Sequence, residues 1–131
     1  MVAHFHVDTD FLVYALATTG PERMRLRAIA ATDAILEMSA IAWYEFCRGP
    51  RTPEQVAVAR ALFGEGGILP FTEEMAEVAA EQFRQLGSPR KRAADIAIAI
   101  SALHRDAVLL TRNVRDFSGV EGLRVEKPRE A

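Results

Sequence analysis

The stretch RAADIAIAISALH, residues 92–104, and the stretch AVLLTRN, residues 107–113, decide the fold. After Asp95 the first stretch is apolar on every side, which predicts a helix that is buried all round. It is too short to span a membrane, which takes about 20 apolar residues. The second stretch is short, apolar and partly β-branched, as is typical of a buried parallel strand. Together they indicate an α/β core with a ligand site at one end.

The composition is that of one globular domain. The chain has 131 residues, 50% of them hydrophobic, and we expect a single domain over residues 1–131 with a frayed polar tail from residue 126. The net charge of −2 gives no general attraction to nucleic acid, so any basic surface must be local. The one cysteine, Cys47, excludes an internal disulfide framework, and we expect it to be buried. The first residues lack the pattern of a signal peptide, so we expect a soluble cytoplasmic protein.

Strand and helix patterns alternate along the sequence. We expect strands at residues 3–7, 35–38, 68–69, 107–110 and 123–125, and helices from residue 11 and at residues 22–33, 40–48, 53–62, 73–86 and 92–104. The capping box from Thr52 to Gln55, with Pro53 at the first helical position, fixes the start of the fourth helix. This alternation predicts an α/β fold with a short central parallel sheet flanked by helices, an α/β/α sandwich with right-handed crossovers.

Four acidic residues recur at corresponding places in this pattern. Asp8 ends the first strand, Glu45 lies on the helix after the second, Asp95 opens the central helix and Asp116 follows the fourth strand. Carboxyl ends of parallel strands share one edge of a sheet, so these side chains can converge there. Converging carboxylates repel one another unless a cation lies between them, and oxygen ligands select Mg²⁺ or Mn²⁺. The chemistry expected is attack of activated water on a phosphodiester.

Four blocks of the sequence resemble those of PIN-domain ribonucleases, and more narrowly those of the VapC toxins of bacterial toxin–antitoxin pairs. The blocks are HVDTDFL at residues 6–12, SAIAWYEF at 39–46, ADIAIA at 94–99 and LTRNVRDF at 110–117. The resemblance covers almost the whole chain, in order, and the last block is the most specific. It implies a metal-dependent endoribonuclease of a type II toxin–antitoxin system, with Mg²⁺ as cofactor and Mn²⁺ as a substitute. It also implies a homodimer, an RNA substrate and inhibition by a cognate antitoxin.

The same resemblance assigns the site residues. The catalytic and metal-binding acids of the family carry over onto Asp8, Glu45, Asp95 and Asp116. Family members differ in whether position 113 or 116 reaches the metal, and Asn113 would supply only a neutral oxygen, so Asp116 is preferred. Position 10 is usually Ser or Asn in the family and is Asp10 here. It either adds a metal-facing carboxylate or caps the first helix, which needs only one acid.

Several other residues each have two possible roles. The cations flanking the acidic blocks, Arg92, Arg112 and Arg115 above all, either hold RNA phosphates or are solvated loop charges. Thr111 either holds a water or carboxylate or caps the last turn. The aromatic residues around Glu45 are core, or part of a dimer or antitoxin surface. The histidines at positions 4, 6 and 104 lack metal-ligand spacing, so we expect them to be structural or exposed.

Three other classes of protein share some of these features. A phosphatase of the haloacid-dehalogenase type also begins with a strand followed by Asp-x-Asp, but it needs a later lysine and an acidic pair that the chain does not offer. A signalling receiver domain needs a phospho-accepting aspartate after the third strand, where ILPF at residues 68–71 has none. A binding module without catalysis would not need the four intact acids.

Overall fold

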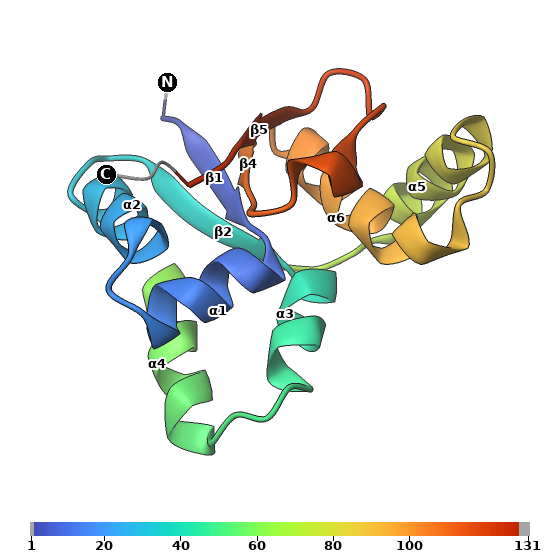
Figure 1. Ribbon diagram of the computed structural model, residues 1–131. Coiled ribbons are helices and arrows are strands. Elements are labelled where there is room, and N and C mark those ends of the chain that lie inside the picture. The colour runs from blue at the N-terminus through green and yellow to red at the C-terminus, as the bar shows by residue number, and fades with distance from the viewer. Residues whose placement is uncertain (1, 129–131) are drawn as a thin grey trace.

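The computed structural model describes residues 2–128, which contain one five-stranded parallel sheet (Figure 1). Its strands, in chain order, are β1 (His4–Val7), β2 (Ile35–Ser39), β3 (Ile68–Leu69), β4 (Val108–Leu110) and β5 (Arg124–Glu126). The order across the sheet is β3-β2-β1-β4-β5, so β1 lies in the middle. Phe5 pairs with Leu36 on one side and with Val108 on the other. The predicted α/β class with a parallel sheet is confirmed.

Helices cover both faces of the sheet. They are α1 (Thr9–Ala17), α2 (Pro21–Ala30), α3 (Ala40–Cys47), α4 (Pro53–Phe63), α5 (Glu73–Gln85) and α6 (Ala93–His104). Figure 1 shows α1, α2 and α4 together on one side, and α6 with α5 beyond it on the other. Two short 3₁₀ turns, Arg90–Arg92 and Val114–Phe117, precede α6 and follow β4. No helix within residues 2–128 is long and apolar enough to cross a membrane.

The central helix α6 is buried because it lies between two layers. Ile98, Ala99 and Ala102 join the main core against the sheet. Ile96 and Ile100, on the opposite side of α6, pack against Met75 and Ala79 of α5 in a second cluster. A helix with apolar neighbours on two sides needs apolar residues all round, which explains the pattern of residues 96–103.

A buried carboxylate ties β1 and β2 to the end of α6. Glu37 Oε1 lies 3.1 Å from His4 Nδ1 and 3.1 Å from His6 Nε2, and Arg105 Nη2 donates to Glu37 Oε2 at 2.8 Å. Burial raises the pKa of Glu37, but the hydrogen bonds from Arg105 and His4 outweigh it, so the pKa is below its usual value. Burial lowers the pKa of His6 despite the Glu37 carboxylate. His4 and His6 therefore have the structural role that was predicted.

Helix orientation places some residues differently from the prediction. Cys47 is exposed, because Ala42 and Phe46 take the core face of α3 and the next residue points about 100° away. In α2 the buried apolar residues are Leu26 and Ile29, while the apolar Met24 is exposed. Among the aromatic residues near Glu45, Phe46 is buried and Tyr44 is exposed.

The last strand runs one residue further than predicted. The Glu126 carbonyl accepts a hydrogen bond from the Thr111 N–H at 3.0 Å, and its carboxylate is held by Arg25 Nε at 2.6 Å. These two contacts draw Glu126 into β5 instead of leaving it in the tail. Residues 129–131 of the predicted tail lie outside the described residues.

Candidate active site

A polar pocket of about 340 Å³ lies at the carboxyl ends of β1 and β4. The order of the chain reverses across β1, with β2 on one side and β4 on the other, and parallel sheets bind ligands at this position. Among the residues that line the pocket are the four predicted acids, the extra acid and the predicted amide: Asp8, Glu45, Asp95, Asp116, Asp10 and Asn113. The fold thus brings together side chains from β1, α1, α3, α6 and the segment after β4.

Asp8 is the most firmly held of these acids. It is buried, its Oδ1 accepts from the Thr9 N–H at 2.9 Å, and its Oδ2 accepts from the Thr111 hydroxyl at 2.8 Å. Burial raises the pKa of Asp8 to about 6, aided by the nearby Asp10 and Glu45, although both hydrogen bonds oppose the shift. Because Asp8 also caps α1, the capping role is filled without Asp10.

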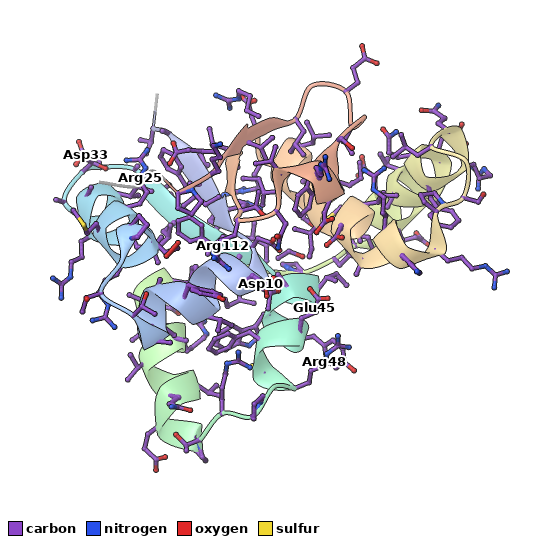
Figure 2. The ribbon with its side chains drawn as sticks, in the orientation of Figure 1. Asp10, Arg25, Asp33, Glu45, Arg48 and Arg112 are labelled. Atoms are coloured by element: carbon purple, nitrogen blue, oxygen red, sulfur yellow. The ribbon has the colours of Figure 1, made fainter. Side chains whose placement is uncertain are left out.

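Glu45 is held by the residue that follows Asp8. The Thr9 hydroxyl lies 3.1 Å from Glu45 Oε1 and 3.1 Å from the Ala42 carbonyl oxygen, so its proton is shared between the two acceptors. Glu45 is half-buried and lines the acidic pocket. Figure 2 shows Asp10 and Glu45 close together where the start of α1 meets α3.

Asp10 and Asn113 form a pair across the mouth of the pocket. Asn113 Nδ2 donates to Asp10 Oδ2 at 3.0 Å, and the Asn113 N–H donates to the Thr111 hydroxyl at 3.0 Å. Both side chains are exposed. Of the two readings of Asp10, the structure therefore supports the pocket-facing carboxylate.

Asp95 has the most perturbed carboxyl group in the pocket. Its pKa is raised to about 7, first by burial and then by the charges of Asp8, Asp116 and Glu45, against a small opposing effect of Arg92. Like charges that raise one another's pKa values mark a site that is electrostatically incomplete without a cation or protons.

The donor set fits a hard divalent cation. Carboxylate and amide oxygens are the ligands that Mg²⁺ and Mn²⁺ prefer, and neither His nor Cys lines the pocket. In the described part of the chain, no three His, Cys, Asp or Glu side chains are arranged closely enough to hold an ion as they stand. Asp8 is buried and held by two hydrogen bonds, whereas Glu45 and Asp95 are half-buried and Asp116 is exposed.

The arginines predicted to bind phosphates do not line the pocket, although Arg92 is near enough for its charge to oppose the rise in the pKa of Asp95. Arg112 stacks over the Tyr14 ring, with its guanidinium carbon 3.4 Å from the ring centroid, and its Nε lies 3.7 Å from Glu22 Oε2. Arg92 is held by backbone, with Nε donating to the Asp116 carbonyl at 3.2 Å. Arg115 is exposed. None of these three is among the residues that line the pocket.

Two arginines that the sequence analysis did not single out line the acidic pocket. Arg48 ends α3, and Arg51 lies in the loop before α4. Figure 2 shows Arg48 further along α3 from Glu45, at the spacing of one helical turn. The i,i+3 spacing from Glu45 could have predicted that Arg48 lies near the pocket. No local pattern could have predicted this for Arg51, because the path of a loop is set by tertiary packing.

A second, apolar groove adjoins the acidic pocket. It has a volume of about 650 Å³ and lies between α1, α2 and α4. Apolar side chains such as Leu16, Leu26, Val58 and Leu62 line it, with Arg23 and Arg27 among its polar residues. Val13, Pro50 and Arg51 line both cavities, so the groove leads directly to the carboxylates.

The chain belongs to the PIN-domain family: the PIN domain profile matches residues 6–123, almost the whole chain. This match covers all four sequence blocks and favours the PIN interpretation over the phosphatase and receiver alternatives. No curated protein matches by sequence.

Solved structures of toxin–antitoxin systems have the same fold. A chain of a toxin–antitoxin complex from Klebsiella pneumoniae has a TM-score of 0.72 and 24% identity, over 98% of this chain and 99% of that one. A chain of VapBC2 from Rickettsia felis, bound to a promoter DNA fragment, has a TM-score of 0.73 and 18% identity, over 96% and 99%. A chain of DNA-bound VapBC from Salmonella typhimurium has a TM-score of 0.70 and 20% identity, over 97% of this chain and 98% of that one. The structural neighbours are thus VapC toxins of VapBC systems.

Proposed function

We propose that this protein is a metal-dependent endoribonuclease, the toxin of a type II toxin–antitoxin pair. The observation that carries the proposal is the convergence of Asp8, Glu45, Asp95 and Asp116 on one pocket at the switch point of the sheet. A pocket that gathers carboxylates disfavours a polyanionic substrate unless a cation is bound there, and a PIN domain supplies a framework for such a site.

These four acids would hold Mg²⁺, with Mn²⁺ as a substitute. The ion, when bound, supplies a Lewis acid for phosphodiester oxygens and lowers the pKa of water. Thr9 and Thr111 fix the Glu45 and Asp8 carboxylates, so part of the site is organised in advance. In the metal-free site burial and the neighbouring carboxylates raise the pKa of Asp95 to about 7, and a bound cation would relieve that repulsion.

The apolar groove supports the antitoxin part of the proposal. A segment of a cognate antitoxin laid between α1, α2 and α4 would bury exposed Val58 and Leu62 and reach the acidic pocket past Arg51. The neighbouring VapBC structures contain toxin with antitoxin. A homodimer and a cytoplasmic location, where cellular RNA is available, belong to the same proposal; light scattering of the purified toxin tests the dimer.

The test is cleavage of total cellular RNA by purified, antitoxin-free protein with Mg²⁺ or with EDTA. We expect fragments only with Mg²⁺, and a loss of at least about a hundredfold in rate for Asp95→Asn. Asp33→Asn is the matched control, because Asp33 is an exposed acid outside the pocket (Figure 2). Equal cleavage by wild-type protein and Asp95→Asn, or undiminished cleavage in EDTA, would contradict the proposed site.

A further inference from the structure

Arg51 is held rigidly at the boundary between the acidic pocket and the groove. Its Nη1 donates to the Phe46 carbonyl at 2.8 Å, in the last turn of α3, and its guanidinium carbon lies 4.3 Å from the centroid of the Phe46 ring. Phe46 itself is buried in the core. A guanidinium that is stacked on a fixed ring and bonded to a fixed carbonyl has already lost much of its conformational freedom.

Gly49 makes this conformation of Arg51 possible. A Cβ at position 49 would lie 1.7 Å from Arg51 Nη1 and 2.9 Å from its guanidinium carbon, so the side chain folds back through the space that the missing Cβ leaves. The backbone at Gly49 is not in the left-handed region, so alanine is tolerated there by the main chain. Substitution by alanine would therefore displace the Arg51 head group and change little else.

Arg51 forms no ion pair with the residues that the structure describes. In residues 2–128 no carboxylate lies within ion-pair distance of it, whereas Arg48 is 3.9 Å from Glu45 Oε2. Only one of its five donors is bonded to protein. The remaining donors form a fork of the kind that binds a phosphate in a bidentate manner.

We propose that Arg51 binds a backbone phosphate of the RNA strand next to the scissile one. This inference rests on the proposed function, because a strand whose phosphodiester enters the carboxylate pocket necessarily brings its flanking phosphates to the rim. Five carboxylates at the pocket repel those phosphates, and Arg51 is the cation at that rim held in a fixed position. It is a positioning residue for substrate and specifies no base.

The test measures binding of a fluorescein-labelled single-stranded oligoribonucleotide by anisotropy over a range of KCl concentrations. Asp95→Asn serves as background, with Mg²⁺ present, so that the RNA stays intact. We expect Arg51→Ala to raise the Kd about tenfold. We also expect the slope of log K against log salt to fall by about 0.7, the value for one phosphate on a single strand.

Three further variants separate position from charge and from folding. Gly49→Ala should raise the Kd comparably although the net charge is unchanged, because the head group is displaced. Arg51→Lys should keep the salt slope but recover only part of the affinity, since lysine lacks the fork. Arg84→Ala is the control: Arg84 is paired with Glu81 on the exposed side of α5, so the Kd and slope should not change. Circular dichroism checks that each variant is folded.

The outcomes are distinguishable from those of the proposed function. Unchanged Kd and slope for folded Arg51→Ala and Gly49→Ala would overturn the inference, even if wild-type protein cleaves RNA. Normal RNA binding by these variants with loss of antitoxin binding would also overturn it, and would assign Arg51 to the protein partner. Wild-type protein that binds RNA through Arg51 but cleaves nothing would refute the nuclease proposal alone.

Discussion

At the scale of single residues, Thr111 connects the two sides of the candidate site. It is fully buried, donates to Asp8 Oδ2 and accepts from the Asn113 N–H, so one hydroxyl orders an acid after β1 and the segment after β4. The sequence left open whether Thr111 holds a carboxylate or caps a turn, and in the structure its hydroxyl does both. Only the pairing of β1 with β4 brings these residues together.

The hydroxyl of Thr111 can be removed without a change of shape. We expect Thr111→Val to lower the rate of RNA cleavage about tenfold to a hundredfold, because it leaves Asp8 without its oriented donor. Thr111→Ser keeps the hydroxyl and should retain most of the activity. Initial cleavage rates at saturating Mg²⁺ measure the difference. A valine variant as active as the serine variant would show that the hydrogen bond to Asp8 has no part in catalysis.

Asp95 should make the stability of the metal-free protein depend on pH. Its pKa in the folded protein, about 7, is above its ordinary value of 3.8, so the folded state holds the proton more tightly than the unfolded chain. Protonated Asp95 therefore leaves the folded state fully stable at low pH. This stability is lost as the pH rises through about 7 and the buried carboxyl group becomes charged. Asp95→Asn, which removes the charge, should exceed wild-type protein in free energy of unfolding at about pH 8.5, and the excess should shrink toward about pH 6.5.

Urea unfolding in EDTA at several pH values measures this difference. The comparison stops near pH 6.5, the ordinary pKa of histidine, because buried His6, whose pKa is lowered, destabilises the fold as the pH falls further. Asp8, with a pKa of about 6, adds to the same trend, and because its charge raises the pKa of Asp95 the comparison measures the coupled pair. An excess of stability that is the same at all pH values would mean that Asp95 does not titrate in this range.

At the scale of elements, Glu37 joins two strands to a helix far from the acidic pocket. We expect Glu37→Ala to lower the free energy of unfolding by about 3 kcal/mol, because it leaves buried His6 and the Arg105 guanidinium without their acceptor. Glu77→Ala, on the exposed face of α5, is the control. Thermal or urea unfolding at neutral pH gives the difference, and equal stability of the two variants would contradict the structural role of the cluster.

Element types were predictable because periodicity reports which side of an element is buried. The alternation of strands and helices, the capping box at Thr52 and the buried α6 all depend on neighbours within a few residues. The predicted convergence of Asp8, Glu45, Asp95 and Asp116 followed from parallel topology alone. The Glu37–Arg105 contact did not, because the partners are 68 positions apart and meet only through strand register and the end of α6.

The positions of the arginines around the pocket could not be predicted from local sequence patterns either. Arg112 follows a buried strand directly, which made it a reasonable candidate for the pocket, but stacking on Tyr14 turns it toward α1 and α2. Arg51 reaches the pocket from a loop, and its side chain is positioned by the space that Gly49 leaves and by a ring in α3. Such contacts depend on three-dimensional proximity that local sequence patterns do not encode.

At the scale of the whole molecule, the two cavities lie next to each other and share residues. The acidic pocket lies at the carboxyl edge of the sheet, and three helices on one face form the groove. An occupant of the groove that extends past Val13 and Arg51 would enter the path of a substrate. The fold therefore allows one partner to block the pocket without touching the carboxylates.

The central position of β1 has a consequence for synthesis. Asp8 is made among the first residues, but its neighbours in the pocket, Asn113 and Asp116, are among the last of the 131. A chain emerging from the ribosome carries Asp8, Glu45 and later Asp95 with no β4 to pair beside β1. The proposed site is therefore complete only after β4 and the segment that follows it have been made and β4 has paired beside β1.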